Sequence, residues 1–164
     1  MLALIATDGS DASLAAARWC DDHLPATTEF AVASVAPLPA DPNADAGGIE
    51  GPLLDADSTE HIESDALAVA DTAVRATADA IALHPVERRI VRGEAGVAVC
   101  SLADELDVDI VVVGSHQHSA LTRVFLGSVS DYVVHHSKRP VIVVPLVEDG
   151  SAESDDEADA IVLS

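Results

Sequence analysis

Residues 109–145, DIVVVGSHQHSALTRVFLGSVSDYVVHHSKRPVIVVP, contain two apolar strands separated by a loop and a helix. The strands, DIVVVG (109–114) and RPVIVVP (139–145), are continuous apolar runs rather than alternating ones. Such runs are typical of strands that are covered on both faces in a parallel sheet. The segment from about Ser128 to His136 has a helical pattern. This strand–helix–strand unit predicts an α/β protein with helices on both faces of a parallel sheet.

The rest of the chain extends the same alternation. Further strands are predicted at 2–7, 29–36 and 86–91, and helices at 11–24 and 58–83, with another helix before residue 109. One face of the helix at 58–83 is expected to be buried, since its smaller and apolar residues recur at three- and four-residue steps. These residues are Leu67, Ala70, Val74, Thr77 and Ile81.

The predicted organisation is one domain over residues 1–147, a doubly wound sheet with a flexible loop at 37–60. This loop is rich in proline, glycine and aspartate and lacks periodicity. Residues 148–164 are predicted to form a disordered acidic tail that folding does not require, and the terminal AIVL is expected to fray.

The charge of the chain excludes several classes of partner. It carries 29 acidic and 8 basic residues, a net charge of −21, which repels nucleic acid and anionic membrane surfaces. This composition suits a salt-rich cytosol of the kind found in halophiles, where the repulsion is screened. No signal sequence precedes the first strand and no apolar run approaches the about 18 residues of a membrane span, so a cytoplasmic protein is expected.

Three segments resemble the universal stress protein family. They are ALIATDGSDASLAAARW (3–19), DIVVVGSHQHSALTRVFLGSVSDYVV (109–134) and RPVIVV (139–144). The resemblance implies a five-stranded parallel sheet in the order 3-2-1-4-5, of the adenine-nucleotide alpha-hydrolase-like type. It also implies a homodimer through the last strand, at 140–145. An apolar strand at an open sheet edge favours the same dimer, because unpaired edges promote association.

Some members of this family bind ATP through a glycine signature, which this chain matches incompletely. The first glycine corresponds to Gly114 and the last to Gly127, followed by Ser128, but the middle position is Gln117. ATP, with or without Mg²⁺, is therefore the candidate cofactor. By resemblance, Asp8 approaches the adenosine half, and backbone groups near Val35 contact adenine. The predicted nucleotide-binding residues are Ala6, Thr7, Asp8, Val35, Val113, Gly114, Gln117, Gly127, Ser128 and Val129.

Gln117 is expected to weaken ATP binding. If the middle glycine has a positive φ, a side chain there costs roughly 1 kcal/mol or more. A side chain facing a phosphate also blocks its approach, and each charge-assisted hydrogen bond lost is worth about 1.5–3 kcal/mol. Alternatively, the amide of Gln117 donates to a phosphate itself and restores part of the affinity.

Simpler structural roles remain open for the same residues. Gly127 and Ser128 could form only a turn and a helix cap, and Asp8 could only shape the turn with Ser10. His116 and His118 could ligate a metal, but no third ligand is suggested nearby, so no metal site is predicted.

Three functions are compatible with these features. The first is a nucleotide-responsive dimeric stress protein, and the second is a family member without ATP that acts as a protein-interaction module. The third, an adenylating or hydrolytic enzyme, is the weakest. No base or nucleophile stands in a defined arrangement, and the sequence does not identify a protein partner.

Overall fold

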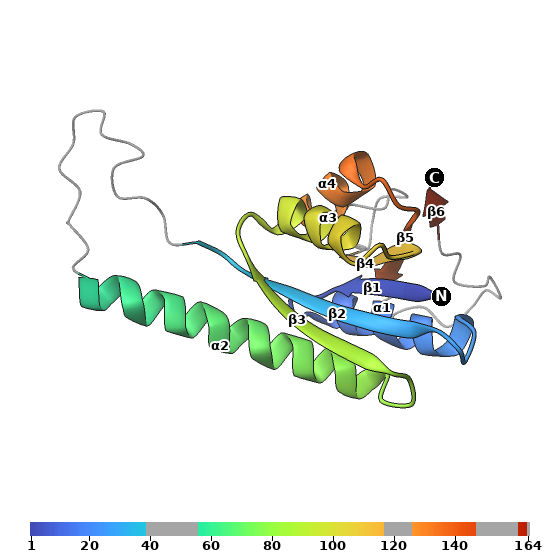
Figure 1. The fold of residues 1–164 in the computed structure, drawn as a ribbon, viewed down its shortest axis with the longest axis horizontal. Helices are drawn as coiled ribbons and strands as arrows, with labels where there is room; N and C mark the ends of the chain where they lie inside the picture. Colours follow the sequence, from blue (N-terminus) through green and yellow to red (C-terminus); the bar gives the residue numbers. More distant parts are fainter. Residues whose placement is uncertain (39–55, 117–125, 147–160, 164) are drawn as a thin grey trace.

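The protein folds around one mixed sheet with helices on both faces (Figure 1). The computed structural model describes residues 1–38, 56–116, 126–146 and 161–163. The strand order is β3-β2-β1-β4-β5-β6, in which the first five strands are parallel and β6 is antiparallel to β5. The predicted five-stranded order 3-2-1-4-5 is confirmed. The elements are β1 (Leu2–Ala6), α1 (Asp11–His23), β2 (Glu29–Ala36), α2 (Ala56–Ala80), β3 (Val86–Arg92), α3 (Ala95–Glu105), β4 (Ile110–His116), α4 (Ser128–His136), β5 (Val141–Leu146) and β6 (Ile161–Leu163).

The two faces of the sheet carry separate hydrophobic clusters. Helices α1 and α2 cover one face, where Ile5, Val32 and Val112 are fully buried. Helices α3 and α4 cover the other face, over Leu4 and Val111. Because successive residues of one strand point to opposite faces, both must be apolar when both faces are covered. This geometry explains the continuous apolar runs in the sequence.

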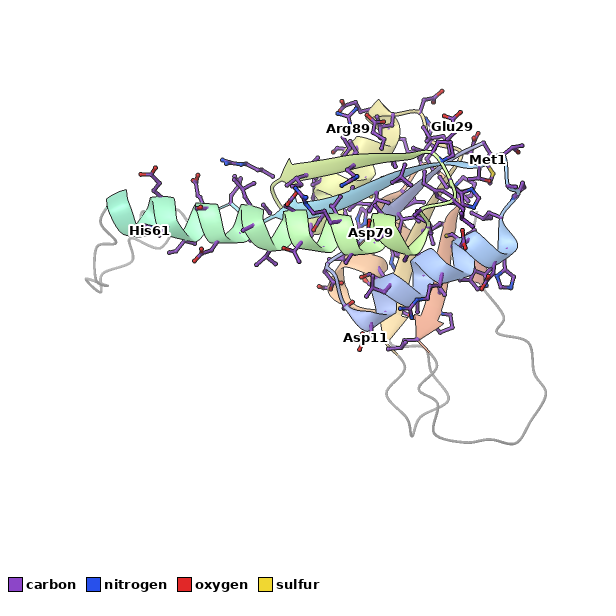
Figure 2. The ribbon with its side chains drawn as sticks, turned by 90° about the horizontal axis from the view of Figure 1, so that it is seen from below. Met1, Asp11, Glu29, His61, Asp79 and Arg89 are labelled. Atoms are coloured by element: carbon purple, nitrogen blue, oxygen red, sulfur yellow. The ribbon has the colours of Figure 1, made fainter. Side chains whose placement is uncertain are left out.

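Helix α2 begins earlier than the sequence indicates and extends past the sheet. Ala56 to Glu60 are helical, so the loop predicted at 37–60 is wrong at its end, and residues 39–55 lie outside the described part. Figure 2 shows His61 on the projecting end of α2 and Asp79 beside the strands. From Glu60 onward, where the side chains of α2 are described, the first buried residue is Ala70. The predicted buried face is confirmed from Ala70 onward, whereas Leu67 is only half-buried.

The end of the chain differs from the expectation of a frayed terminus. Residues 161–163 form β6 and pair with Val141–Val143 of β5, while 147–160 lie outside the described residues. The prediction of disorder for the final apolar residues is therefore wrong. The sequence does not indicate this strand, because three apolar residues that follow many carboxylates carry no periodic signal. Because β6 pairs with β5, the β5 edge is not open. The dimer through 140–145 stays a prediction, but an open edge no longer supports it.

No helix in the described ranges is long and apolar enough to cross a membrane.

We expect the stability of the fold to rise steeply with salt. The net charge of −21 makes the compact chain repel itself, and a Debye length of about 3 Å at 1 M salt removes most of this repulsion. A gain of at least about 3 kcal/mol between low and molar KCl would raise Tm by roughly 6–12 °C for a domain of this size. Thermal melts in KCl and in K₂SO₄ at equal ionic strength measure the effect. A Tm that does not change with ionic strength would contradict the prediction.

Candidate functional site

A cavity of about 220 Å³ opens at the carboxyl ends of β1 and β4. The chain leaves these two neighbouring strands toward opposite faces of the sheet, into α1 after β1 and into α4 after β4. Strand β1 pairs with β2 on one side and β4 on the other, so the order of connections reverses there. Ligands of open α/β sheets bind in the crevice at such a switch point. The cavity has several times the about 30 Å³ that one water molecule occupies in the liquid, so it can admit an organic ligand.

Nine of the ten predicted nucleotide-binding residues line this one cavity. Ala6, Thr7 and Asp8 come from the end of β1, and Val35 comes from β2. On the other side lie Val113 and Gly114 of β4, with Gly127, Ser128 and Val129 at the start of α4. Gln117 lies outside the described residues. The structure therefore brings the predicted residues together, and nucleotide binding by them stays a prediction.

The N-terminus of α4 forms one wall of the cavity without a side-chain cap. Its N-cap is Gly127, and no side-chain hydrogen bond caps the helix. Helix α1 differs, because the side chain of Ser10 accepts a hydrogen bond from the N–H of Ser13. The first N–H groups of a helix carry partial positive charge and attract anions. Gly127 and Ser128 are exposed there, so α4 offers donors that an anion can reach.

Ser130 fixes the position of this helix start relative to the sheet. Its Oγ lies 3.3 Å from the carbonyl oxygen of Gly114 and 3.3 Å from that of Gly127. The hydroxyl is buried, so it links the end of β4 to the first turn of α4 away from solvent. Because the hydroxyl has a single proton, it can donate to either carbonyl oxygen, and Ser130 contacts both glycines of the signature.

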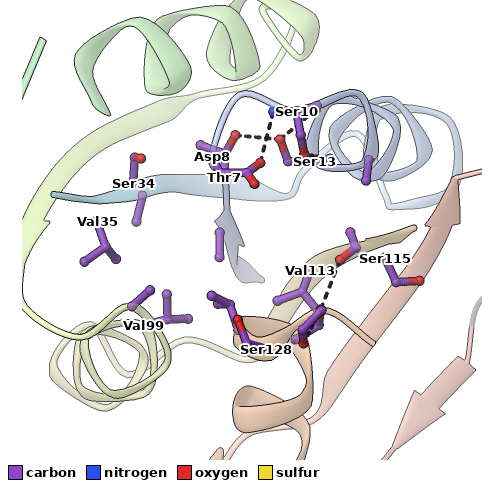
Figure 3. Close-up of a pocket in the computed structure, with 18 residues that line it drawn as sticks. Thr7, Asp8, Ser10, Ser13, Ser34, Val35, Val99, Val113, Ser115 and Ser128 are labelled. Carbon is purple, nitrogen blue, oxygen red and sulfur yellow. Dashed lines mark hydrogen bonds between the residues drawn. The ribbon is translucent and has the colours of Figure 1, made fainter. Parts of the chain in front are cut away.

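The opposite wall is the turn between β1 and α1. Gly9 has φ of +78°, which favours glycine, and the N–H of Ser10 donates to Asp8 Oδ1 at 3.0 Å. Partial burial raises the pKa of Asp8, whereas hydrogen bonds from the hydroxyl and the N–H of Ser10 lower it. The hydrogen bonds outweigh the burial, so the pKa of Asp8 lies below its ordinary value. Asp8 is therefore ionised at neutral pH. Figure 3 shows Asp8 and Ser10 on the side of the cavity opposite Ser128.

A buried hydroxyl network supports this turn from behind. Thr7 Oγ1 donates to Ser13 Oγ at 3.0 Å and accepts from the N–H of Gly9 at 3.0 Å. It also lies 2.7 Å from Thr77 Oγ1 of α2. Since the single proton of Thr7 goes to Ser13, Thr77 must be the donor in the third bond. Helix α2 also approaches at Ala73, whose Cβ would lie 3.1 Å from a Cβ at Gly9.

Replacing Thr77 with valine should destabilise the fold by about 1–2 kcal/mol, because a buried acceptor site on Thr7 loses its donor. Urea denaturation at molar salt measures the loss. The same substitution in a Thr7→Val background should cost much less, because the interaction is already gone. An equal cost in both backgrounds would mean that the network does not couple the two residues.

Several residues of the cavity were missed by the sequence-based prediction. Ser34 lies next to a predicted residue of β2, and Val99 lies on a helix that carries no motif. Their positions depend on which elements the topology brings together, and no local pattern signals this. The missed lining residues are Ser10, Ala12, Ser13, Ala33, Ser34, Ala95, Val99, Ser115 and Ser130.

The fold and this cavity define a doubly wound α/β protein with a small-ligand site at its topological switch point. The model of the universal stress protein family matches residues 3–145, and the chain belongs to this family. Two curated relatives are from Synechocystis sp.: universal stress protein Sll1388 is 44% identical over 32% of this chain, and Slr1101 is 40% identical over 34%. The matches span 34% and 51% of those proteins, so they cover only part of each relative.

Solved structures with the same fold cover nearly the whole chain. The structure of hypothetical protein MJ0577, whose curated counterpart is from Methanocaldococcus jannaschii, has a TM-score of 0.68 at 20% identity over 90% of this chain and 97% of that one. A family member from Arabidopsis thaliana with AMP bound has a TM-score of 0.63 at 16% identity, over 91% and 94% of the two chains. A universal stress protein in complex with cAMP has a TM-score of 0.56 at 24% identity, over 88% and 96%. These likenesses establish the fold.

Proposed function

We propose that this chain is a stress-response protein that binds an adenine nucleotide in the cavity between β1, β2 and α4, with an ATP site weakened by Gln117. One observation carries the proposal: an uncapped helix start, at Gly127 and Ser128, faces an ionised Asp8 across a cavity at the switch point. Structural neighbours are described with AMP and with cAMP, which supports an adenine nucleotide as the ligand class.

The two walls suit the two ends of a nucleotide. The N–H groups at the start of α4 and the hydroxyl of Ser128 are donors for phosphate oxygens. Asp8 is a charged acceptor on the other wall, and a carboxylate there suits ribose hydroxyls better than phosphate. Val35 and Val99 give apolar contact for a base. The described lining holds one carboxylate, so we expect any Mg²⁺ to enter bound to the phosphates of ATP.

The decisive experiment identifies the ligand directly. Freshly purified protein is denatured, and mass spectrometry identifies any released nucleotide. The stripped protein is then titrated with ATP, AMP and cAMP at molar salt, where repulsion from the acidic surface is screened. Binding of one of these that is lost in Gly127→Ala supports the proposal. No released nucleotide and no binding in the millimolar range would overturn it.

The proposal extends to the compartment. The chain carries a net charge of −21 over 164 residues, and salt screens the repulsion among these charges. This charge supports a salt-rich cytoplasm as the compartment of the protein.

A protein-interaction module without ATP is the second candidate function. It is favoured by Gln117 and by the projecting part of α2, where Ile62 is 49% exposed and Val69 is 66% exposed. Large apolar side chains on a protruding helix are available to a partner. This reading predicts that Ile62→Glu abolishes a cellular function that Gly127→Ala leaves intact.

A further inference from the structure

The strand β6 occupies the outer edge of β5 in an antiparallel sense, beside five parallel strands (Figure 1). The paired residues are Val141 with Leu163, Ile142 with Val162, and Val143 with Ile161. We propose that β6 is an intramolecular cap that keeps the chain monomeric, and that its release exposes β5 as a pairing surface for the β5 of a second copy. This inference does not depend on any ligand.

The two edges of the sheet are protected in different ways. Edge strand β3 carries Glu87, Arg88 and Arg92, all exposed, and charged side chains discourage pairing with another chain. The β5 segment from Val141 to Val144 carries no charge. A flat apolar strand with free N–H and C=O groups is a template for association. The β5 edge therefore needs a cover, and the structure supplies it with β6.

A second copy of β5 would compete with β6 for the same groups. Two copies related by a two-fold axis meet through the same strand in antiparallel orientation, which is the orientation of β6. Ile161-Val162-Leu163 also matches Val141-Ile142-Val143 in character, since both are short runs of branched apolar residues. The outer N–H and C=O groups of β5 can bond to only one of these strands at a time, so the two pairings exclude each other.

The balance favours β6 at ordinary protein concentrations. A strand on the same chain competes at an effective concentration that reaches the order of millimolar when its linker permits contact. A second copy in a micromolar solution is far more dilute. The predicted dimer through 140–145 then belongs to the state in which β6 has left the edge. Pro145 has no N–H to donate, which limits how far along β5 another strand can pair.

The test compares masses in molar NaCl by size-exclusion chromatography with light scattering. One variant ends at Val147, and another carries Ile161→Pro with Val162→Pro in the full chain. Adjacent N–H groups of a strand point to opposite sides, so one of these prolines removes a donor that faces β5. The matched control is Ile161→Val with Val162→Ile, which keeps both the donors and the apolar character.

We expect the full chain and the control to have the monomer mass of 16.9 kDa, and both cap variants to have about twice that mass. Hydrogen exchange should slow at Ile161–Leu163 in the full chain, which reports the cap without mutation. A full chain that is already dimeric would overturn the proposal. This holds if the prolines leave that dimer intact, and it also holds if they dissociate it because β6 of each copy pairs with β5 of the other. Cap variants that fold and stay monomeric at millimolar concentration would also overturn it.

Discussion

Replacing Gly114 with alanine should destabilise the protein by about 3 kcal/mol or more, at the upper end of the range for overpacking. A Cβ at this position would overlap the carbonyl oxygen of Ala12 and would lie 2.5 Å from its carbonyl carbon and 2.9 Å from the nitrogen of Ser13. All three are backbone atoms of α1, so they cannot rotate aside as a side chain can. Relief requires α1 to move away from β4. Urea denaturation at molar salt measures the loss.

Gly127→Ala is the matched control, because the second glycine of the signature has space around it. A Cβ there would have its nearest neighbour, Ser130 Oγ, at 3.6 Å, and the φ of −63° suits any residue. We expect a stability loss below about 1 kcal/mol, from the poorer N-cap alone. Nucleotide binding should nevertheless fall, since the added methyl group lies where a phosphate would approach. Equal losses of stability in both variants would contradict this division of roles.

Gly114 and Gly127 have different roles in the structure, and the signature does not distinguish them. Gly114 and Gly127 look equivalent in the signature, and both are among the predicted nucleotide-binding residues. In the structure, Gly114 is required because α1 packs directly on the end of β4. Which backbone passes close to a glycine is set by tertiary packing. No local pattern of residues could therefore have separated the two roles.

The strands and the buried helix faces were predictable because burial on both sides imposes a visible pattern, whereas the strand order followed only from the resemblance to the family. Runs such as Val111–Val113 must be apolar at every position, and Ala70, Val74 and Thr77 must repeat with the helical period. The cavity could be predicted at its glycines and at Asp8, since turns impose special residues. Other lining residues could not be predicted, because Ser34 and Val99 reach the cavity only through the topology. The pairing of β6 likewise depends on an edge that exists only after β5 has folded.

Replacing Gln117 with glycine should strengthen ATP binding at least tenfold. Gln117 follows His116, the last residue of β4, and the other predicted phosphate-site residues, Gly127 and Ser128, already line the cavity. Tenfold corresponds to about 1.4 kcal/mol. Relief of roughly 1 kcal/mol of backbone strain and recovery of one hydrogen bond to a phosphate, worth about 1.5–3 kcal/mol, would together exceed this. Calorimetric titration of wild type and variant at molar salt measures the gain.

The double variant Gln117→Gly with Gly127→Ala separates a restored phosphate site from a general effect on the loop. If the gain comes from phosphate contacts, the alanine methyl group should remove it, while stability stays near that of the single variant because Gly127 has space for a Cβ. Low-micromolar ATP binding by the wild type would mean that Gln117 is tolerated, through its amide or by facing away. A variant that binds no better than a weak wild type would place the defect elsewhere. The exposed apolar face of α2, at Ile62 and Val69, would then be the better candidate for the working surface.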